Sequence, residues 1–338
     1  RDSRNMRNIV IACGGTGGHL TPGIALAQNL EERGYPSWLF ISQKAVDSRL
    51  ARKYPKLSFE AMPGAPLIKS PLGLLRFGHG FAFSFLRSYR FYGQVGADAL
   101  VGFGGFSSFG PAMAARARGI PIYIHEANRA VGKAVRFLAK RANRLYLPEG
   151  MHLEGMSPEV IRNVGYPLRK EFRRIPKERA RKQLGISLSD RLLVVLGGSQ
   201  GAVALNRWVK DKLEPLAAEG ISTYCLTGMS NESSGVVQLE GIGGQTITNR
   251  FVSFTDEMNT VLSAADLVIS RAGAGAIAEI VRCRIPSILI PYPYAADNHQ
   301  FLNADFLERK GATILCPEDK MAGNLLDEVR EVMFNEEF

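Results

Sequence analysis

Two copies of one local pattern constrain the fold of this 338-residue chain: an apolar run, a glycine-rich loop and then a helix-like stretch. In the first copy NIVIAC at 8–13 precedes GGTGGHLTPG, and a helix-like stretch runs from Ile24 to Glu32. In the second copy LLVVL at 192–196 precedes GGSQGA at 197–202. Continuous apolar runs are typical of strands buried in parallel sheets. The pattern predicts an α/β fold with two βαβ domains, each with its own glycine loop.

Further strand candidates alternate with helical stretches along the chain: Trp38–Ser42, Ala99–Val101, Pro121–His125, Leu267–Ser270 and Ser287–Pro291. Strands that alternate with helices predict parallel sheets, and such sheets bind ligands at the carboxyl ends of their strands. The boundary between the domains is expected in VGYPLR, so that residues 1–165 and 166–338 form the two domains.

The glycine loops disfavour two common kinds of nucleotide site. GGTGGHL does not match G-x-G-x-x-G, and no acidic residue near position 42 could bind an adenosine ribose, so an NAD site is not expected. The chain has no G-K-[ST], so a P-loop is absent. A glycine loop after a strand still lets the backbone approach a ligand and directs helix N–H groups toward phosphate.

The basic residues are concentrated in the first half of the chain. The net charge is +10, yet residues 1–165 hold 22 Lys and Arg against 10 Asp and Glu. Residues 166–338 are close to neutral. This asymmetry indicates that the first half meets something anionic, such as nucleic acid, a lipid surface or a phosphorylated substrate.

The cysteines and the apolar runs predict the compartment. The four cysteines form no C-x-x-C pair, and three lie in or beside apolar runs, as is typical of buried free thiols in a reducing compartment. No signal peptide is visible. No apolar run reaches about 18 residues, so none is predicted to span a bilayer.

Seven ordered segments resemble a known family. They are GGTGGHLTPG (14–23), GGFSSFGP (104–111), HEAN (125–128), GYPLR (165–169), GGSQGA (197–202), RAGAGAIAE (271–279) and DNHQFLNA (297–304). The set is similar to the MurG family, which transfers N-acetylglucosamine from UDP-GlcNAc to lipid I, undecaprenyl-pyrophosphoryl-MurNAc-pentapeptide, to give lipid II. The resemblance covers nearly the whole chain. It implies a GT-B architecture of two Rossmann-like domains facing across a cleft, the acceptor on the first and the donor on the second, with inversion at the anomeric carbon.

The chemistry requires that the departing UDP be stabilised. A metal bound by D-x-D often does this, but the chain contains no D-x-D, which leaves backbone N–H groups and helix N-termini. We therefore expect no metal, and the family implies no cofactor. By resemblance the diphosphate and sugar contact Ala274, Gly275, Ala276, Ser199 and Gln200. Family members often carry Thr at the position of Ala276, so this chain lacks a hydroxyl that could contact a phosphate there.

The resemblance implies further donor contacts. Glu279 would accept hydrogen bonds from the two uridine ribose hydroxyls, because one carboxylate suits two adjacent donors. Phe254 and Thr255 would frame the uracil. His299 and Gln300 would bind the GlcNAc hydroxyls, and Arg169 would lie near the donor phosphates.

Two residues compete for the role of general base. His19 follows the first glycine loop, and imidazole can accept a proton at cellular pH. A helix N-terminus would lower its pKa and favour the neutral form. A contact with the acceptor pyrophosphate is the alternative role. Glu126 could be the base itself or could orient the acceptor sugar, and the remaining acceptor-side residues implied by the family are Thr16, Gly17, Gly18 and Asn128.

The stretch 67–95 mixes aromatic residues with four cations and contains no acid. A second basic set has helical spacing: Lys133, Arg136, Lys140, Arg141 and Arg144. Such a mixture suits the interface of an anionic membrane, here the inner leaflet that would hold the acceptor's lipid. The expected location is the cytoplasmic face of the plasma membrane, with other cell-wall synthesis proteins as further partners.

Other functions fit part of the sequence. A diacylglycerol glycosyltransferase or a UDP-GlcNAc 2-epimerase would share the two domains, although the epimerase needs no acceptor and no membrane face. A non-catalytic module that binds a lipid carrier would keep the basic aromatic face but would not need Glu279, Ser199 or His19. Nucleic-acid binding would explain the charge but not the paired glycine loops, so no nucleic acid is expected as a partner.

Overall fold

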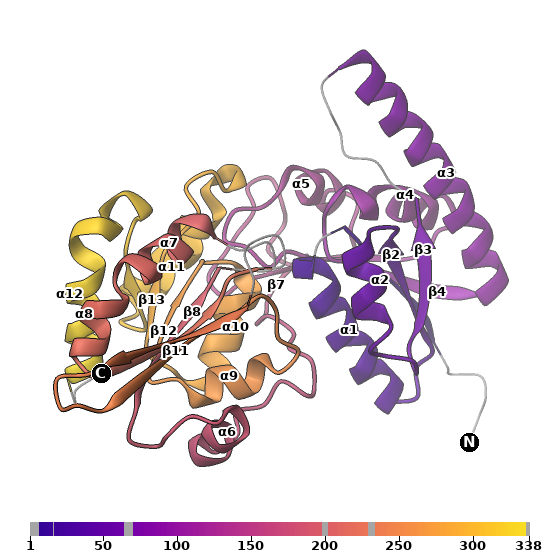
Figure 1. Cartoon of the computed structure of the whole chain (residues 1–338). Helices are drawn as coiled ribbons and strands as arrows, with labels where there is room; N and C mark the ends of the chain where they lie inside the picture. Colours follow the sequence, from indigo (N-terminus) through magenta and orange to yellow (C-terminus); the bar gives the residue numbers. More distant parts are fainter. Residues whose placement is uncertain (1–6, 16, 64–69, 198–201, 229–233, 336–338) are drawn as a thin grey trace. The chain divides into compact units, whose positions relative to one another are not determined.

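A computed structural model describes residues 7–15, 17–63, 70–197, 202–228 and 234–335. The chain divides into two compact units, residues 1–170 and 171–338, each built around a seven-stranded sheet (Figure 1). Among the described residues, no helix combines the length and apolar character needed to cross a membrane.

The first unit is a parallel sheet in the order β3-β2-β1-β4-β5-β6-β7. Its strands are β1 (Asn8–Ala12), β2 (Ser37–Ser42), β3 (Ser58–Met62), β4 (Ala97–Gly102), β5 (Ile122–His125), β6 (Arg144–Leu147) and β7 (Ile161–Asn163). Its helices are α1 (Gly17–Glu32), α2 (Ala45–Ala51), α3 (Pro71–Val95), the 3₁₀ turn η2 (Phe106–Ser108), α4 (Phe109–Ala117) and α5 (Lys133–Ala139).

Strand β1 shows why its sequence is a continuous apolar run. Val10 and Ala12 belong to the core on the side of α3, α4 and α5, whereas Ile11 and Cys13 belong to the core on the side of α1 and α2. Successive side chains of a strand point to opposite faces, and both faces of this sheet are buried. An alternating pattern would leave one face polar, so the apolar run correctly predicted a covered parallel strand.

Helix α1 begins at Gly17, seven residues before the predicted start at Ile24. Because glycine has a low helix propensity, the sequence did not predict that residues 17–23 are helical. Pro22 lies inside the helix and has no N–H to donate to the carbonyl of Gly18. The Tyr166 hydroxyl donates to that carbonyl at 3.2 Å instead. A residue far along the chain thus satisfies the group that the proline leaves without a partner.

The segment predicted to hold the domain boundary stays with the first unit. Besides Tyr166, Arg169 Nη1 donates to the Tyr54 hydroxyl at 2.9 Å, and the Lys170 backbone N–H donates to Gln28 Oε1 at 3.0 Å. These bonds connect residues 166–170 to the first unit, which extends to Lys170.

The second unit has the strand order β10-β11-β9-β8-β12-β13-β14. Its strands are β8 (Arg191–Leu196), β9 (Ile221–Leu226), β10 (Gly235–Glu240), β11 (Thr246–Val252), β12 (Leu267–Ser270), β13 (Ser287–Leu289) and β14 (Ile314–Leu315). Its helices are α6 (Lys177–Leu184), α7 (Val203–Asp211), α8 (Leu213–Ala218), α9 (Met258–Ala264), α10 (Ala274–Cys283), η3 (Ala296–Asn298), α11 (His299–Arg309), η4 (Glu318–Lys320) and α12 (Met321–Phe334). Only the edge strand β10 is antiparallel among these described strands.

Candidate donor and acceptor sites

Each sheet has one point where the strand order reverses, between β1 and β4 in the first unit and between β8 and β12 in the second. Connections leave such neighbouring strands in opposite directions, which opens a crevice at their carboxyl ends. The loops after β1 and β4 therefore frame one candidate site, and the loop after β12 frames the other.

His19 lies in the first turn of α1, directly after the loop that follows β1. Its ring packs against the turn after β4: a Cβ added to Gly105 would lie 3.2 Å from Cε1 of His19. Gly105 also has φ of 74°, which side chains rarely adopt. The absence of a side chain at Gly105 thus makes room for the imidazole at the reversal point of the sheet.

The surroundings of His19 favour its neutral form. Burial lowers its pKa below the usual value, and the positive charge of Lys44 acts in the same direction. The carboxylates of Glu126 and Asp47 oppose this by favouring the charged ring. Because the net shift is downward, the imidazole can accept a proton at neutral pH.

Glu126 follows β5 and is buried. Its Oε1 accepts from the backbone N–H and the side-chain amide of Asn128, at 2.9 and 3.2 Å. Its Oε2 accepts from the backbone N–H of Gly132 at 3.2 Å. Both oxygens therefore hold the loop that leads to α5, and Asn128 is oriented by the same carboxylate.

The second candidate site is built around the N-terminus of α10. Ala274, Gly275 and Ala276 form the first turn of that helix, and Gly273 before them provides no side-chain cap. N–H groups in a first helical turn have no intrahelical acceptor, and the helix dipole makes this end positive. No acidic residue lies in the turn, so it suits a diphosphate.

The amide of Gln300 is fixed by two backbone groups. Its Oε1 accepts from the N–H of Ala272 at 3.2 Å and from the N–H of Tyr292 at 3.0 Å. Asn303, which is buried, donates to the carbonyl of Ala272 at 3.1 Å. The Gln300 oxygen is thus engaged, so its NH₂ group is the part suited to a ligand hydroxyl, as a donor.

A backbone carbonyl likewise fixes the tautomer of His299. Its Nδ1 lies 2.8 Å from the carbonyl oxygen of Ala296, which can only accept, so Nδ1 carries the proton. In the neutral ring Nε2 is then an acceptor. Asp297 and Asn298, just before it, both adopt left-handed φ values of 52° and 53°. Non-glycine residues in this region store strain, which often accompanies a ligand-binding loop.

Sequence reasoning overlooked Arg271, the first residue of RAGAGAIAE. Its guanidinium is buried, forms an ion pair with Glu318, and lies over the Tyr292 ring with its central carbon 5.5 Å from the ring centroid. It also donates to the carbonyl of Ile290 at 3.3 Å. Arg271 thereby joins the loops after β12 and β13. An arginine directly after a buried strand was the signal available in the sequence.

Of the other predicted donor residues, Glu279, Phe254 and Thr255 lie in the second unit. Glu279 is half-buried on α10, Phe254 is exposed after β11, and the Thr255 hydroxyl accepts from the N–H of Glu257 at 3.1 Å. Arg169 belongs to the first unit, where it bonds Tyr54, so its predicted role at the donor phosphates stays a prediction. Gly17 and Gly18 lie in the first turn of α1, and Thr16, Ser199 and Gln200 lie outside the described residues.

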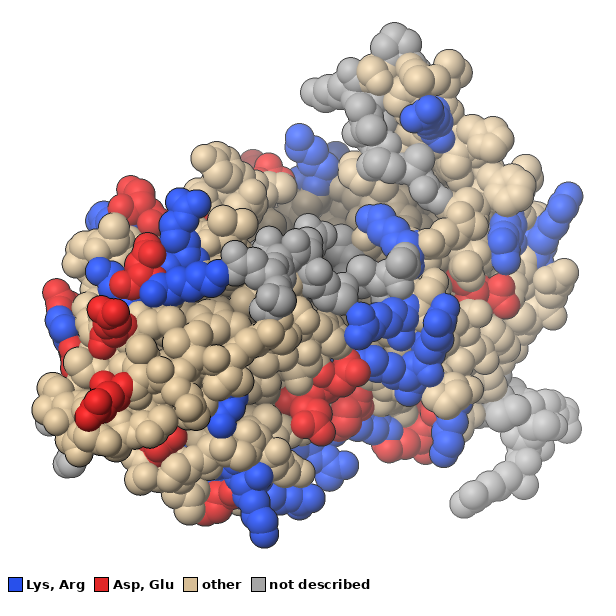
Figure 2. Space-filling view, viewed as in Figure 1, with Lys and Arg blue, Asp and Glu red and all other residues tan. Residues whose placement is uncertain are grey.

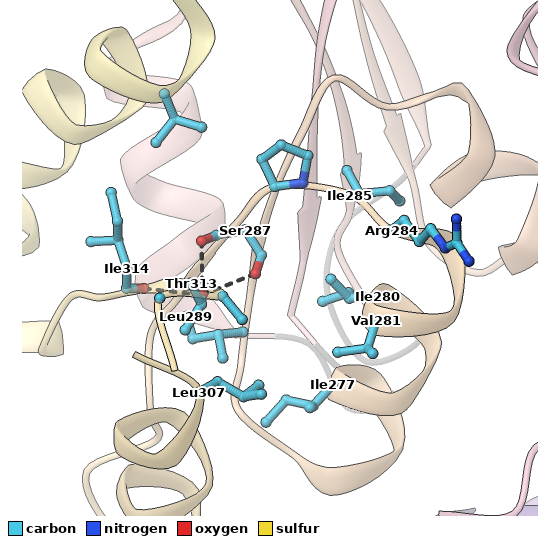
Figure 3. A pocket seen from close by; sticks show the side chains of 14 residues that line it. Ile277, Ile280, Val281, Arg284, Ile285, Ser287, Leu289, Leu307, Thr313 and Ile314 are labelled. Atoms are coloured by element: carbon cyan, nitrogen blue, oxygen red, sulfur yellow. Dashed lines mark hydrogen bonds between the residues drawn. The ribbon is translucent and has the colours of Figure 1, made fainter. Parts of the chain in front are cut away.

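A cavity of about 360 Å³ lies elsewhere in the second unit (Figure 3). Ile277, Ile280 and Val281 of α10 line one side, with Leu307 and Ile314 opposite. Its polar lining includes Ser287, whose hydroxyl and carbonyl oxygens both lie within 2.9 Å of the Thr313 hydroxyl. Ser287 begins β13, so this cavity is at the amino end of the strands and is separate from the candidate donor site. The part of the chain described here contains no cluster of metal-binding side chains.

The chain matches two family models. Residues 9–147 match the glycosyltransferase family 28 N-terminal domain, and residues 192–338 match the family 28 C-terminal domain. A protein of Opitutus terrae is 46% identical over 98% of this chain and 88% of its own length. It is named UDP-N-acetylglucosamine--N-acetylmuramyl-(pentapeptide) pyrophosphoryl-undecaprenol N-acetylglucosamine transferase, as is a protein of Carboxydothermus hydrogenoformans that is 33% identical over 94% of this chain and 88% of its own length.

The chain belongs to this family of N-acetylglucosamine transferases. Solved structures agree on the fold. The crystal structure of MurG from Acinetobacter baumannii has a TM-score of 0.71 at 23% identity, covering 98% of this chain and 92% of that one. The kitacinnamycin glycotransferase has a TM-score of 0.73 at 14% identity, with the same coverage. The predicted family and the predicted fold class of two Rossmann-like domains are therefore confirmed.

Proposed function

We propose that this chain transfers GlcNAc from UDP-GlcNAc to the 4-hydroxyl of MurNAc in lipid I, with inversion, to give lipid II. The observation that carries the proposal is the 46% identity, over 98% of the chain, to the Opitutus terrae transferase named for this reaction. The paired sites at the two sheet reversal points fit a reaction with one donor and one acceptor.

The second unit is the proposed donor site. The positive N-terminus of α10 would stabilise the charge that develops on UDP as the glycosidic bond breaks, without a metal. Glu279 would accept from the ribose hydroxyls, and Phe254 with Thr255 would frame the uracil. The NH₂ of Gln300 and Nε2 of His299 would bind the GlcNAc hydroxyls as a donor and an acceptor, respectively.

The first unit is the proposed acceptor site, with His19 as the general base. The neutral imidazole would take the proton of the MurNAc 4-hydroxyl as that oxygen attacks the anomeric carbon, and the electron pair of the breaking bond would pass to UDP. Glu126 would position Asn128 and the loop beside the acceptor, because its two oxygens already accept three hydrogen bonds.

A membrane-facing surface would hold the lipid of the acceptor. Helix α3 buries Ser84, Ser88 and Tyr92, while Leu75 and Leu86 on its outer side are 71% and 54% exposed. Three arginines, Arg76, Arg87 and Arg90, are spaced along this helix, and basic side chains stand among uncharged ones on its surface (Figure 2). Rings connect α3 to α5 through packed pairs: Phe77–Phe81, Phe81–Phe109 and Phe109–Phe137.

This surface suits peripheral binding to anionic lipid at the cytoplasmic face of the plasma membrane. Replacing Leu75 and Leu86 together by Asp should abolish co-sedimentation with vesicles containing phosphatidylglycerol. Burying one leucine is worth about 1.5–3 kcal/mol, so the loss should exceed about tenfold. The matched control is Ile242→Asp, which changes an exposed apolar residue of the second unit. Equal binding by both variants would refute the proposed surface.

The reaction is tested with labelled UDP-GlcNAc and a lipid I analogue in detergent. The intact chain should form labelled disaccharide-lipid. His19→Ala should lower the rate of transfer about 10²–10⁴-fold while UDP still binds. Glu279→Ala should weaken UDP binding itself. The exposed residues His152 and Glu214 provide the matched alanine controls. Formation of UDP-ManNAc from UDP-GlcNAc alone, or no transfer to the analogue by the intact chain, would contradict the proposed function.

A further inference from the structure

We propose that Asp47, together with Lys44 and Ser107, positions the Gly14–Gly15 loop and thereby fixes where His19 meets the acceptor. The inference rests on the proposed function for its catalytic consequence. The geometry itself is independent of that function, because it concerns three side chains that bind one short stretch of backbone.

Three side chains from two segments, η2 and the start of α2, hydrogen-bond to this stretch. The Ser107 hydroxyl, from η2, donates to the carbonyl of Gly14. Oδ2 of Asp47, from α2, accepts from the N–H of Gly15 at 3.0 Å. Nζ of Lys44, the residue just before α2, donates to the carbonyl of Gly15 at 2.8 Å. Three consecutive polar groups of the backbone are thus held by side chains rather than by secondary structure.

The loop has little freedom of its own within this arrangement. A Cβ at Gly14 would lie 2.3 Å from the backbone nitrogen of Ser42, so this position admits only glycine. Gly15 has φ of 118°, a conformation that side chains rarely adopt. Glycines alone would leave the loop with many conformations, and the three side chains select one of them.

Asp47 is itself firmly placed. Its Oδ2 also accepts from the N–H of Ser42 at 3.0 Å and from the Ser42 hydroxyl at 2.6 Å. The residue is completely buried, and its other oxygen, Oδ1, has no hydrogen-bond partner among the described residues. Burying a carboxylate with one unsatisfied oxygen destabilises a fold.

The charge of Asp47 also reaches His19. Four charged or titratable groups face the imidazole: Glu126, Asp47, Lys44 and His125. The carboxylates raise the pKa of His19, whereas Lys44 lowers it. Removing the charge of Asp47 should therefore lower that pKa further and move the acid limb of the pH–rate profile toward lower pH.

The variants Asp47→Ala, Asp47→Asn and Ser107→Ala separate position from charge. Asp98→Ala is the matched control, because Asp98 Oδ2 accepts from the N–H of Asn8 at 2.8 Å at the opposite end of β1. We expect Asp47→Ala and Ser107→Ala to lower kcat/KM for the lipid I analogue by at least about tenfold, with UDP affinity unchanged. Asp47→Asn keeps an acceptor oxygen, so it should lose less activity yet still shift the acid limb.

Hydrogen exchange provides a readout that does not depend on activity. The Gly15 amide should exchange at least about tenfold faster in Asp47→Ala, whereas Asp98→Ala should leave it unchanged. If the intact chain makes no product, the proposed function fails, and the positioning role is then tested only by the exchange rate of the Gly15 amide. Product from the intact chain with unchanged kcat/KM in both Asp47→Ala and Ser107→Ala would overturn the inference, as would an unaltered Gly15 exchange rate. Should Asp47→Ala not fold, Asp47→Asn and Ser107→Ala decide by the same measurements.

Discussion

Replacing Glu126 by Gln distinguishes a residue that holds a loop from one that removes a proton. The glutamine oxygen can keep the Asn128 hydrogen bonds or the Gly132 hydrogen bond, but its NH₂ group must then face a backbone N–H. At least one buried hydrogen bond is lost. The cost of leaving such a group unsatisfied is about 1–3 kcal/mol.

For a unit of this size, each kcal/mol lowers Tm by about 2–4 °C, so Glu126→Gln should melt about 2–12 °C lower. We expect kcat to fall by about tenfold, well short of the 10²–10⁴-fold contribution of a general base. The Glu126 carboxylate also raises the pKa of His19, so the acid limb of the pH–rate profile should move to lower pH.

The measurements are thermal unfolding and the transfer assay on the same preparation. Glu149→Gln is the control, because Glu149 is an exposed acidic residue of the same unit. A loss of kcat beyond about a thousandfold at an unchanged Tm would refute the positioning role and assign the base to Glu126.

Three further predictions follow from the same contacts. Burial lowers the pKa of His125 to about 4, so between about pH 6.5 and pH 4 His125 binds a proton in the unfolded chain but not in the folded one. The free energy of unfolding should therefore fall by up to about 3 kcal/mol over this range. Urea unfolding of His125→Asn should lack this part of the fall, and an equal dependence of the unfolding free energy on pH in both proteins would contradict the prediction. Gln300→Glu keeps the acceptor for Ala272 and Tyr292 but removes the NH₂ donor, so KM for UDP-GlcNAc should rise about tenfold at constant Tm, whereas an unchanged KM would exclude the sugar contact. Gly105→Ala should destabilise the chain by about 1–2 kcal/mol and lower kcat/KM for the acceptor, and wild-type values in both assays would refute the packing against His19.

The sequence by itself predicted the strands at the two reversal points, β1, β4, β8 and β12, together with β2, β5 and β13. β8 and β12 are buried on both faces, so their continuous apolar runs identify them without tertiary information. The motif order predicted the family, because glycines, acids and amides at fixed spacing are a local property of the chain. The sequence patterns did not predict β3, β6, β7, β9, β10, β11 or β14. Strand β10 is an exposed edge strand that pairs only with its antiparallel neighbour β11 among the described strands.

Only the tertiary structure decided what several side chains do. The carbonyl of Gly18 accepts from Tyr166, and the N–H of Gly15 donates to Asp47, although these partners are distant in sequence. Likewise, only the structure shows that the side-chain oxygens of Glu126 and Gln300 already accept hydrogen bonds from the backbone. A sequence shows which donors and acceptors a residue carries, but the folded backbone determines which of them are already satisfied and which remain for a substrate.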